Sequence, residues 1–253
     1  MRQALDRPWL RQLLALALFL GLWEGAARAG LVNPFFLPPP SQVGGVLLTL
    51  VAEGSIWPHL YATFLAALLG LAAGIGAGAV LGFAGALLPC VAELLVPVMI
   101  LLNAVPRVIL APLFVIWLGI DLESKVALAF VLVAVVMFFA VYSGIKEVDK
   151  RLVERVRTLG GGRWLLLREV YVPSVVVWVM GGMKVAVGFA FTGAVVGEFV
   201  ASSRGLGYLL SFAQSTYNAA LSLALVILVI GFVLLLFATA GLLERRLLRW
   251  KYR

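Results

Sequence analysis

Long apolar segments constrain this chain more than any other feature. With 253 residues that are 63% hydrophobic, it holds more apolar surface than one soluble core could bury. Six stretches each hold about 20 largely apolar residues, enough to cross about 30 Å of hydrocarbon as a helix. The expected spans are residues 12–29, 58–85, 92–119, 125–146, 173–201 and 218–243. Since the alternating ten-residue pattern of a barrel is missing, the sequence predicts an all-α polytopic membrane protein with six transmembrane helices, as a single domain over residues 1–253.

Glycine and proline distinguish two of these spans. Prolines interrupt the third span at Pro97, Pro106 and Pro112. The second span carries a small residue every four positions, at Gly70, Gly74, Gly78 and Gly82. Such a stripe lets another helix approach closely. We expect it to pack within the chain, with a subunit interface as the alternative.

The net charge of +8 could indicate a nucleic-acid partner, but the position of the basic residues argues against one. They cluster before the first span, between the fourth and fifth spans, and after the last. These three regions lie on one side of a six-span chain. The positive-inside rule therefore places both termini and the fourth loop in the cytoplasm, with the first span retained as an anchor. Membrane lipid, and no nucleic acid, is the expected surrounding.

Residues for enzyme chemistry or metal binding are sparse. His59 is the only histidine and lies at the mouth of the second span, where an interfacial role is expected. Cys90 is the only cysteine, which excludes an intrachain disulfide and a cysteine-based metal cluster. No phosphate-binding loop of the G-x4-G-K-[ST] type occurs. The sequence therefore predicts a non-catalytic chain without metal or cofactor of its own, so any ATP would be hydrolysed by another chain.

Among the charged residues of the predicted spans, three stand out: Arg107, Lys184 and Glu198. A charge in the membrane costs about 2.5–3.5 kcal/mol, so its default interpretation is functional or paired. We consider these residues candidates for lining a translocation path. Structural pairing or snorkelling to the headgroups is the alternative.

The charged segment 146–173 separates the fourth and fifth spans. Its apolar residues recur at helical spacing, at Val148, Leu152, Val156 and Leu159. This predicts an amphipathic helix, which three glycines at 160–162 would end, followed by a second short helix before Pro173. A helix-turn-helix of this kind exposes apolar residues that need a partner. An ordinary solvated loop is the alternative.

The same segment resembles the EAA loop of bacterial ABC importer permeases, E-A-A-x3-G-x9-I-x-L-P. Glu154, Gly160 and Pro173 match its glutamate, glycine and proline. Arg155 and Val156 replace the two alanines, while Val170 and Val172 replace the isoleucine and leucine.

Other segments extend this resemblance over nearly the whole chain. Residues 111–120, followed by Glu123, Ser124 and Lys125, are similar to the P-L-F-x-x-W-F-G-x-x-x-x-S-K segment of the nitrate, sulfonate and taurine permease group. Gly197-Glu198 and Gly205-Leu206-Gly207 resemble that group's A-E and G-L-G positions. Residues 36–40 resemble its external proline-rich entry. Leu118 stands where the group usually has Phe, and Gly197 where it usually has Ala.

The resemblance implies a type I ABC importer permease of the bacterial inner membrane. Such a subunit pairs with a second permease copy, here expected as a homodimer, and with two ATPase subunits that hold ATP and Mg. An external solute-binding protein would deliver the solute. The ATPase-coupling residues would be Glu154, Leu159, Gly160, Gly161, Gly162, Arg163 and Pro173.

The expected solute is a small anion such as a sulfonate, taurine or nitrate, since two cations lie within spans. A vitamin or pyrimidine precursor, related to riboflavin or thiamine, is the alternative within this class. From another class, an ATP-independent channel or secondary transporter would be expected to show inverted repeats and mid-membrane carboxylates. Neither is visible.

Overall fold

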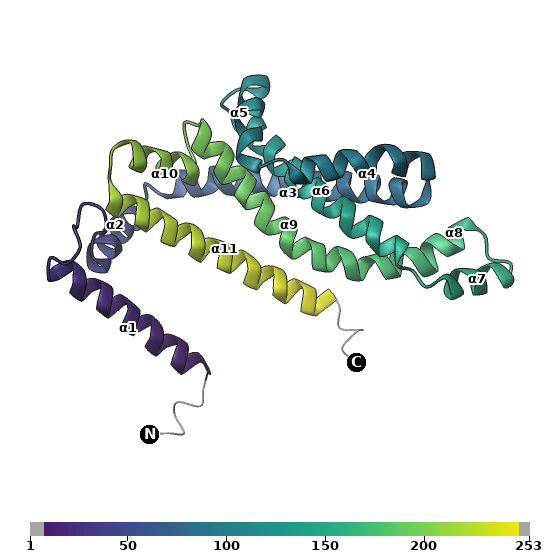
Figure 1. The fold of residues 1–253 in the computed structure, drawn as a ribbon, viewed down its shortest axis with the longest axis horizontal. Coiled ribbons are helices and arrows are strands. Elements are labelled where there is room, and N and C mark those ends of the chain that lie inside the picture. Colours follow the sequence, from purple (N-terminus) through teal and green to yellow (C-terminus); the bar gives the residue numbers. More distant parts are fainter. Residues whose placement is uncertain (1–7, 248–253) are drawn as a thin grey trace. The chain divides into compact units, whose positions relative to one another are not determined.

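The computed structural model describes residues 8–247, and the regular elements in that part of the chain are all helical (Figure 1). The first six are α1 (Pro8–Arg28), α2 (Pro40–Ala52), α3 (Trp57–Leu87), α4 (Pro89–Ala104), α5 (Arg107–Leu118) and α6 (Leu122–Lys146). They are followed by α7 (Lys150–Thr158), α8 (Arg163–Leu166), the π-helical segment η2 (Leu167–Tyr171), α9 (Val172–Val200), α10 (Leu206–Ser215) and α11 (Ala219–Leu247).

Within residues 8–247, five helices are long and apolar enough to cross a membrane: α1, α3, α6, α9 and α11. The consecutive helices α4 and α5 together would make a sixth span, bent by 107°. The break falls at Val105 and Pro106, where proline lacks an amide donor and holds the preceding residue in an extended conformation. Pro97 and Pro112 lie inside α4 and α5. The all-α prediction is confirmed, and only one of the three prolines breaks the third span.

Contacts divide the chain into two compact units. The first comprises residues 1–57 and 209–230. Within it, the Glu24 carboxylate near the end of α1 accepts hydrogen bonds from the Ser41 amide at 2.9 Å and the Ser41 hydroxyl at 2.7 Å. Arg28 donates to the same carboxylate at 2.6 Å. These bonds tie the end of α1 to the first turn of α2 across the proline-rich connection.

The second unit comprises residues 58–208 and 231–253, and its helices α3 and α6 meet along the glycine stripe. A Cβ atom at Gly74 would lie 2.6 Å from Val133 Cβ and 2.9 Å from the Phe130 carbonyl oxygen. The neighbouring glycines contact α6 in the same way, with Gly70 at Ala129, Gly78 at Met137 and Gly82 at Val141. The prediction that the stripe packs within the chain is confirmed.

Helices α6 and α9 lie side by side in the same unit and run antiparallel (Figure 1). At one end Gly197 faces Lys125, and at the other Gly144 faces Trp178. The start of α6 therefore lies beside the end of α9. The 25 residues of α6 span about 37 Å at 1.5 Å per residue. The segment that joins α6 to α9 is thus about 37 Å from the Lys125 end of the pair.

We expect Gly74→Leu to destabilise the protein by about 2 kcal/mol or more, because its side chain cannot fit against Val133 without moving α3 away from α6. Thermal unfolding of the detergent-purified protein measures this. Gly76→Leu is the matched control, since nothing lies within 4 Å of a Cβ there. Equal unfolding midpoints for the two variants would contradict the packing described here.

Candidate functional site

The segment between α6 and α9 is a helix-turn-helix. Helix α7 begins after Asp149, whose side chain accepts a hydrogen bond from the Arg151 amide at 2.9 Å, an N-cap. Residues 159–162 form the turn, and α8 follows from Arg163. The chain then continues through η2 into α9 without a break. The predicted helix pair is confirmed, but Pro173 lies in the first turn of α9 instead of ending a separate helix.

The turn is a Schellman motif. Gly160 adopts a φ of +79°, the left-handed region that other residues resist. Its amide donates to the Arg157 carbonyl at 2.9 Å, and the Gly161 amide donates to the Val156 carbonyl at 2.8 Å. A Cβ atom at Gly161 would lie 2.5 Å from Val156 Cγ1. Gly160 is therefore required for its backbone angle and Gly161 for its close approach to α7, whereas Gly162 has neither constraint.

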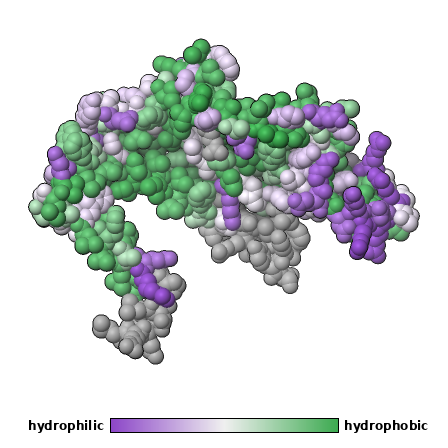
Figure 2. Space-filling view, in the orientation of Figure 1, coloured by the Kyte–Doolittle hydropathy of each residue, from purple (hydrophilic) through white to green (hydrophobic). Residues whose placement is uncertain are grey.

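Apolar side chains stand exposed on this helix-turn-helix. Leu159 is 81% exposed and Trp164 is 74% exposed, and Leu152 and Leu165 are also exposed. Hydrophilic side chains gather around them over α7 and α8 (Figure 2). An apolar centre with a charged rim is typical of a surface that binds another protein.

The two charged residues predicted for coupling, Glu154 and Arg163, are both exposed. The Glu154 main-chain carbonyl accepts from the Thr158 hydroxyl at 2.9 Å. Within the described part of the chain, the Glu154 carboxylate has no ion pair.

The candidates for the translocation path lie in different settings. Arg107 is the first residue of α5, directly after the bend, and its side chain lies outside the described residues. Lys184 lies near the middle of α9 and is exposed. Glu198, in the last turn of α9, is only 2% exposed. Fourteen residues separate Lys184 from Glu198, about 21 Å along the helix, so the two do not form one site.

Glu198 lies at the centre of a buried polar cluster. Its Oε2 atom accepts hydrogen bonds from the Thr63 hydroxyl of α3 at 2.8 Å and from the Gly207 amide at 3.0 Å. Thr63 also accepts a bond from the Leu206 amide at 2.9 Å. These two amides begin α10 and have no partner in their own helix. Side chains of α3 and α9 thus cap α10.

The segment Gly205-Leu206-Gly207 needs both of its glycines. Gly205 has a φ of +122°, and a Cβ atom there would collide with the Glu198 carboxylate. At Gly207 a Cβ atom would lie 2.8 Å from Glu198 Cβ. The Gly205 amide donates to Nδ1 of His59 at 3.0 Å, and the His59 ring stacks on Tyr208 with centroids 5.9 Å apart. His59 therefore holds this segment to α3.

Lys125 lies at the same end of the helices. It is 3% exposed, and its ammonium donates a hydrogen bond to the Ile120 carbonyl. A pocket of about 440 Å³ opens beside it. The charged residues that line this pocket are Asp121, Glu123, Lys125, Glu198 and Arg204. Both signs of charge face one cavity.

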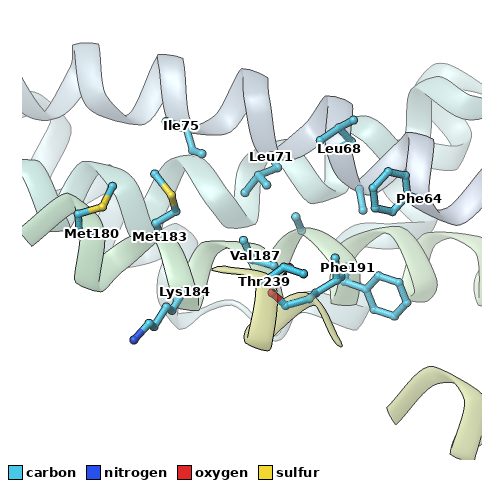
Figure 3. Close-up of a pocket in the computed structure, with 13 residues that line it drawn as sticks. Phe64, Leu68, Leu71, Ile75, Met180, Met183, Lys184, Val187, Phe191 and Thr239 are labelled. Atoms are coloured by element: carbon cyan, nitrogen blue, oxygen red, sulfur yellow. Dashed lines mark hydrogen bonds between the residues drawn. The ribbon is translucent and has the colours of Figure 1, made fainter. Parts of the chain in front are cut away.

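A second pocket, of about 250 Å³, has a different chemistry (Figure 3). It lies among α3, α9 and residues 236–239 of α11, and apolar side chains such as Phe64, Leu71 and Phe191 form most of its wall. The Lys184 side chain points away from the other lining residues (Figure 3). Only the stem of this lysine contributes to an apolar cavity.

Sequence reasoning missed the roles of Thr63, His59 and Lys125 in the buried cluster. Thr63 is a single polar residue inside an apolar run, which only weakly indicates a functional role. Lys125 was more strongly indicated, because it belongs to the segment that resembles the permease group. The hydrogen bonds of Thr63 join residues 135 and 143 positions apart, which residue spacing does not reveal.

Comparison with known proteins decides the family. Residues 70–249 match the family of binding-protein-dependent transport system inner membrane components. The chain belongs to this family. The match begins within α3 and covers the helix-turn-helix, the Glu198 and 205–207 part of the buried cluster and all of α11, whereas His59 and Thr63 lie before it. The chain is thus a permease component of an ABC importer.

Curated permeases match over almost their full length. The chain is 33% identical to the riboflavin transport system permease RibX of Chloroflexus aurantiacus, over 98% of this chain and 93% of RibX. It is 32% identical to the taurine transport system permease TauC of Escherichia coli, over 98% of this chain and 92% of TauC. The formylaminopyrimidine transport permease ThiX of Halalkalibacterium halodurans is 30% identical over 91% of each.

The fold is also known from solved transporters. A chain of the MetNI methionine ABC transporter in an inward-facing conformation has a TM-score of 0.61 at 20% identity, covering 79% of this chain and 96% of the other. A chain of an amino acid ABC transporter has a TM-score of 0.62 at 16% identity, and the match covers 80% of this chain and 97% of the other. The all-helical arrangement is therefore that of ABC importer permeases.

We expect Thr63→Val to destabilise the protein by about 1–3 kcal/mol, because the change leaves the Leu206 amide without its acceptor and Glu198 without one donor. Thr192→Val is the matched control, since its exposed hydroxyl bonds only to the Gly188 carbonyl of its own helix. Thermal unfolding in detergent compares them. Equal effects would mean that the cluster adds nothing beyond a helical threonine.

Proposed function

We propose that this permease forms the translocation path of an importer for a small anionic solute, such as a sulfonate, taurine or nitrate. Two copies of the chain would form the path. Two ATPase subunits would bind ATP and Mg and drive it, and an external solute-binding protein would deliver the solute. The similarity to TauC and to sulfonate permeases over nearly the whole chain supports this solute class.

The exposed helix-turn-helix is the observation that supports the proposed ATPase contact. Leu159 and Trp164 stand in water on the isolated chain, next to the charged residues of α7. Apolar groups of this size are stabilised when a partner covers them. We assign the ATPase-docking role to this surface, with Gly160 and Gly161 setting its turn and Glu154 and Arg163 on its charged rim.

The proposed orientation places the helix-turn-helix and both termini in the cytoplasm. The basic residues of α7 and α8 support it through the positive-inside rule. The cluster around Glu198 then faces the outside, because it lies at the opposite ends of α6 and α9. This is the side from which a solute-binding protein would deliver solute. The charged pocket of about 440 Å³ lies there as well.

An aromatic vitamin is a second candidate solute. The apolar pocket lined by Phe64 and Phe191 favours it, as does the similarity to RibX. Uptake assays on proteoliposomes of the full importer distinguish the candidates. Taurine uptake without riboflavin uptake supports the anion, and the reverse result supports the vitamin.

Gly160→Leu should leave membrane insertion intact but reduce ATP-driven transport at least about tenfold, because a left-handed backbone costs a side-chain-bearing residue about 1–2 kcal/mol and the turn would rearrange. Co-purification of the ATPase and solute uptake measure the effect. Gly162→Leu is the control, with a φ of −77° and open space around it. If Gly160→Leu assembles and transports normally, the turn does not couple the chain to the ATPase.

Lys184→Ala should reduce uptake of an anionic solute about tenfold while ATPase assembly stays unchanged, because the exposed ammonium near the middle of α9 would attract an anion in a low-dielectric path. Lys184→Arg is the control, since it keeps the charge. Normal anion uptake by Lys184→Ala would remove this residue from the path. Uptake and co-purification are measured on the same preparation.

A further inference from the structure

Two oppositely charged residues are buried together at the Glu198 end of the α6 and α9 pair. Lys125 is 3% exposed and Glu198 is 2% exposed. Each lies within electrostatic range of the other. In the part of the chain that the structure describes, no ion pair of 4.0 Å or less joins them. Their attraction acts through space, and both side chains line the charged pocket. It is stronger than between exposed charges because both groups are removed from water.

Helix packing places the two charges. The Lys125 stem lies against α9 at Gly197, the residue directly before Glu198. A Cβ atom at Gly197 would lie 3.2 Å from Lys125 Cγ, so glycine leaves just enough room for the stem. Lys125 therefore stays at the end of α9 because the missing methyl group lets α6 approach.

The hydrogen bonds of the two groups are unequal. The Lys125 ammonium has three N–H donors and one described acceptor, the Ile120 carbonyl. Glu198 accepts from Thr63 and Gly207 through a single oxygen, Oε2. Neutral partners alone do not balance a buried charge. The carboxylates of Asp121 and Glu123 also attract Lys125, but both are exposed to solvent, and the buried Glu198 attracts it most strongly.

We propose that Lys125 and Glu198 are positioning residues that act as a charge-compensated clasp. The clasp holds α6 to α9 and, through Glu198, holds residues 205–207 to α3. It thereby fixes the adjoining residues 202–204, which line the charged pocket. Removing one charge leaves the other buried and poorly compensated, so that the helix ends separate and water reaches residues that are buried in the wall of the pocket. Removing both charges restores the balance.

A buried reporter tests the clasp without any assay of transport. Ala66 lines the same pocket and is 1% exposed. In a Cys90→Ser background, which removes the only native cysteine, Ala66→Cys reports water access through its rate of maleimide labelling in the purified protein. We expect Lys125→Met or Glu198→Gln to raise this rate at least about tenfold, and the double variant to return it to within about threefold of the parent.

Glu198→Gln is the decisive single variant. Its amide oxygen can accept from Thr63 and Gly207 as the carboxylate does, so a role in hydrogen bonding alone predicts no change. Glu123→Gln is the matched control, because it removes from the same pocket an exposed carboxylate whose weaker attraction for Lys125 is screened by solvent. Unchanged labelling of Glu198→Gln, or a double variant no better than the single ones, would overturn the clasp.

If a single variant fails to fold, the amount of protein recovered from membranes tests the clasp instead of the labelling rate. If Lys125→Met or Glu198→Gln is not recovered from membranes, restored recovery of the double variant supports the clasp and its failure overturns it. Solute uptake adds an arm that rests on the proposed function. We expect the single variants to lose uptake about tenfold and the double variant to regain most of it. The labelling rate does not depend on the solute. A wrong solute class would therefore change the uptake result alone, whereas a wrong clasp would change the labelling result.

Discussion

The close approach of α3, α6 and α9 is the constraint on which the other features depend. In a membrane, moving an apolar side chain from lipid to a helix interface gains no hydrophobic free energy, so helices associate through tight packing and polar contacts. Glycines on α3 and α9 bring both helices to the backbone of α6, as Gly74 at Val133 and Gly193 at Ala129 show. Since these contacts fix the register, they decide which residues meet at each end of the bundle.

At the Glu198 end of the bundle, the helix register buries a carboxylate beside groups that stabilise its negative charge. The carboxylate lies next to the first amides of α10, where the helix dipole favours a negative charge. The Thr63 hydroxyl and Nδ1 of His59 accept hydrogen bonds from the Leu206 and Gly205 amides of the same segment. A short helix without a capping residue of its own is thus capped by its neighbours, and its start is tied to two membrane helices.

The sequence predicted the features that depend on local pattern. Hydropathy placed the spans within a few residues, and the glycine stripe and the turn at Gly160 followed from residue types at fixed spacing. It did not predict α10, because Leu206–Ser215 is apolar but too short for a membrane span, and the helix owes its start to Thr63 and Glu198. Pro173 was placed at the end of a helix although proline is equally suited to the first turn of the next one. The burial of Lys125 and Glu198 at one end of the bundle depends on how α6 and α9 pack, which no single segment encodes.

The run from α8 through η2 into α9 is continuous from Arg163 to Val200. Those 38 residues measure about 57 Å along the helix path. Trp164 lies near one end of this path and Glu198 near the other. The π-helical segment η2, between Trp164 and α9, departs from α-helical geometry, so residues 167–171 are a place where the path bends. A force on the exposed tryptophan would therefore reach the Glu198 end in proportion to the stiffness of residues 167–171.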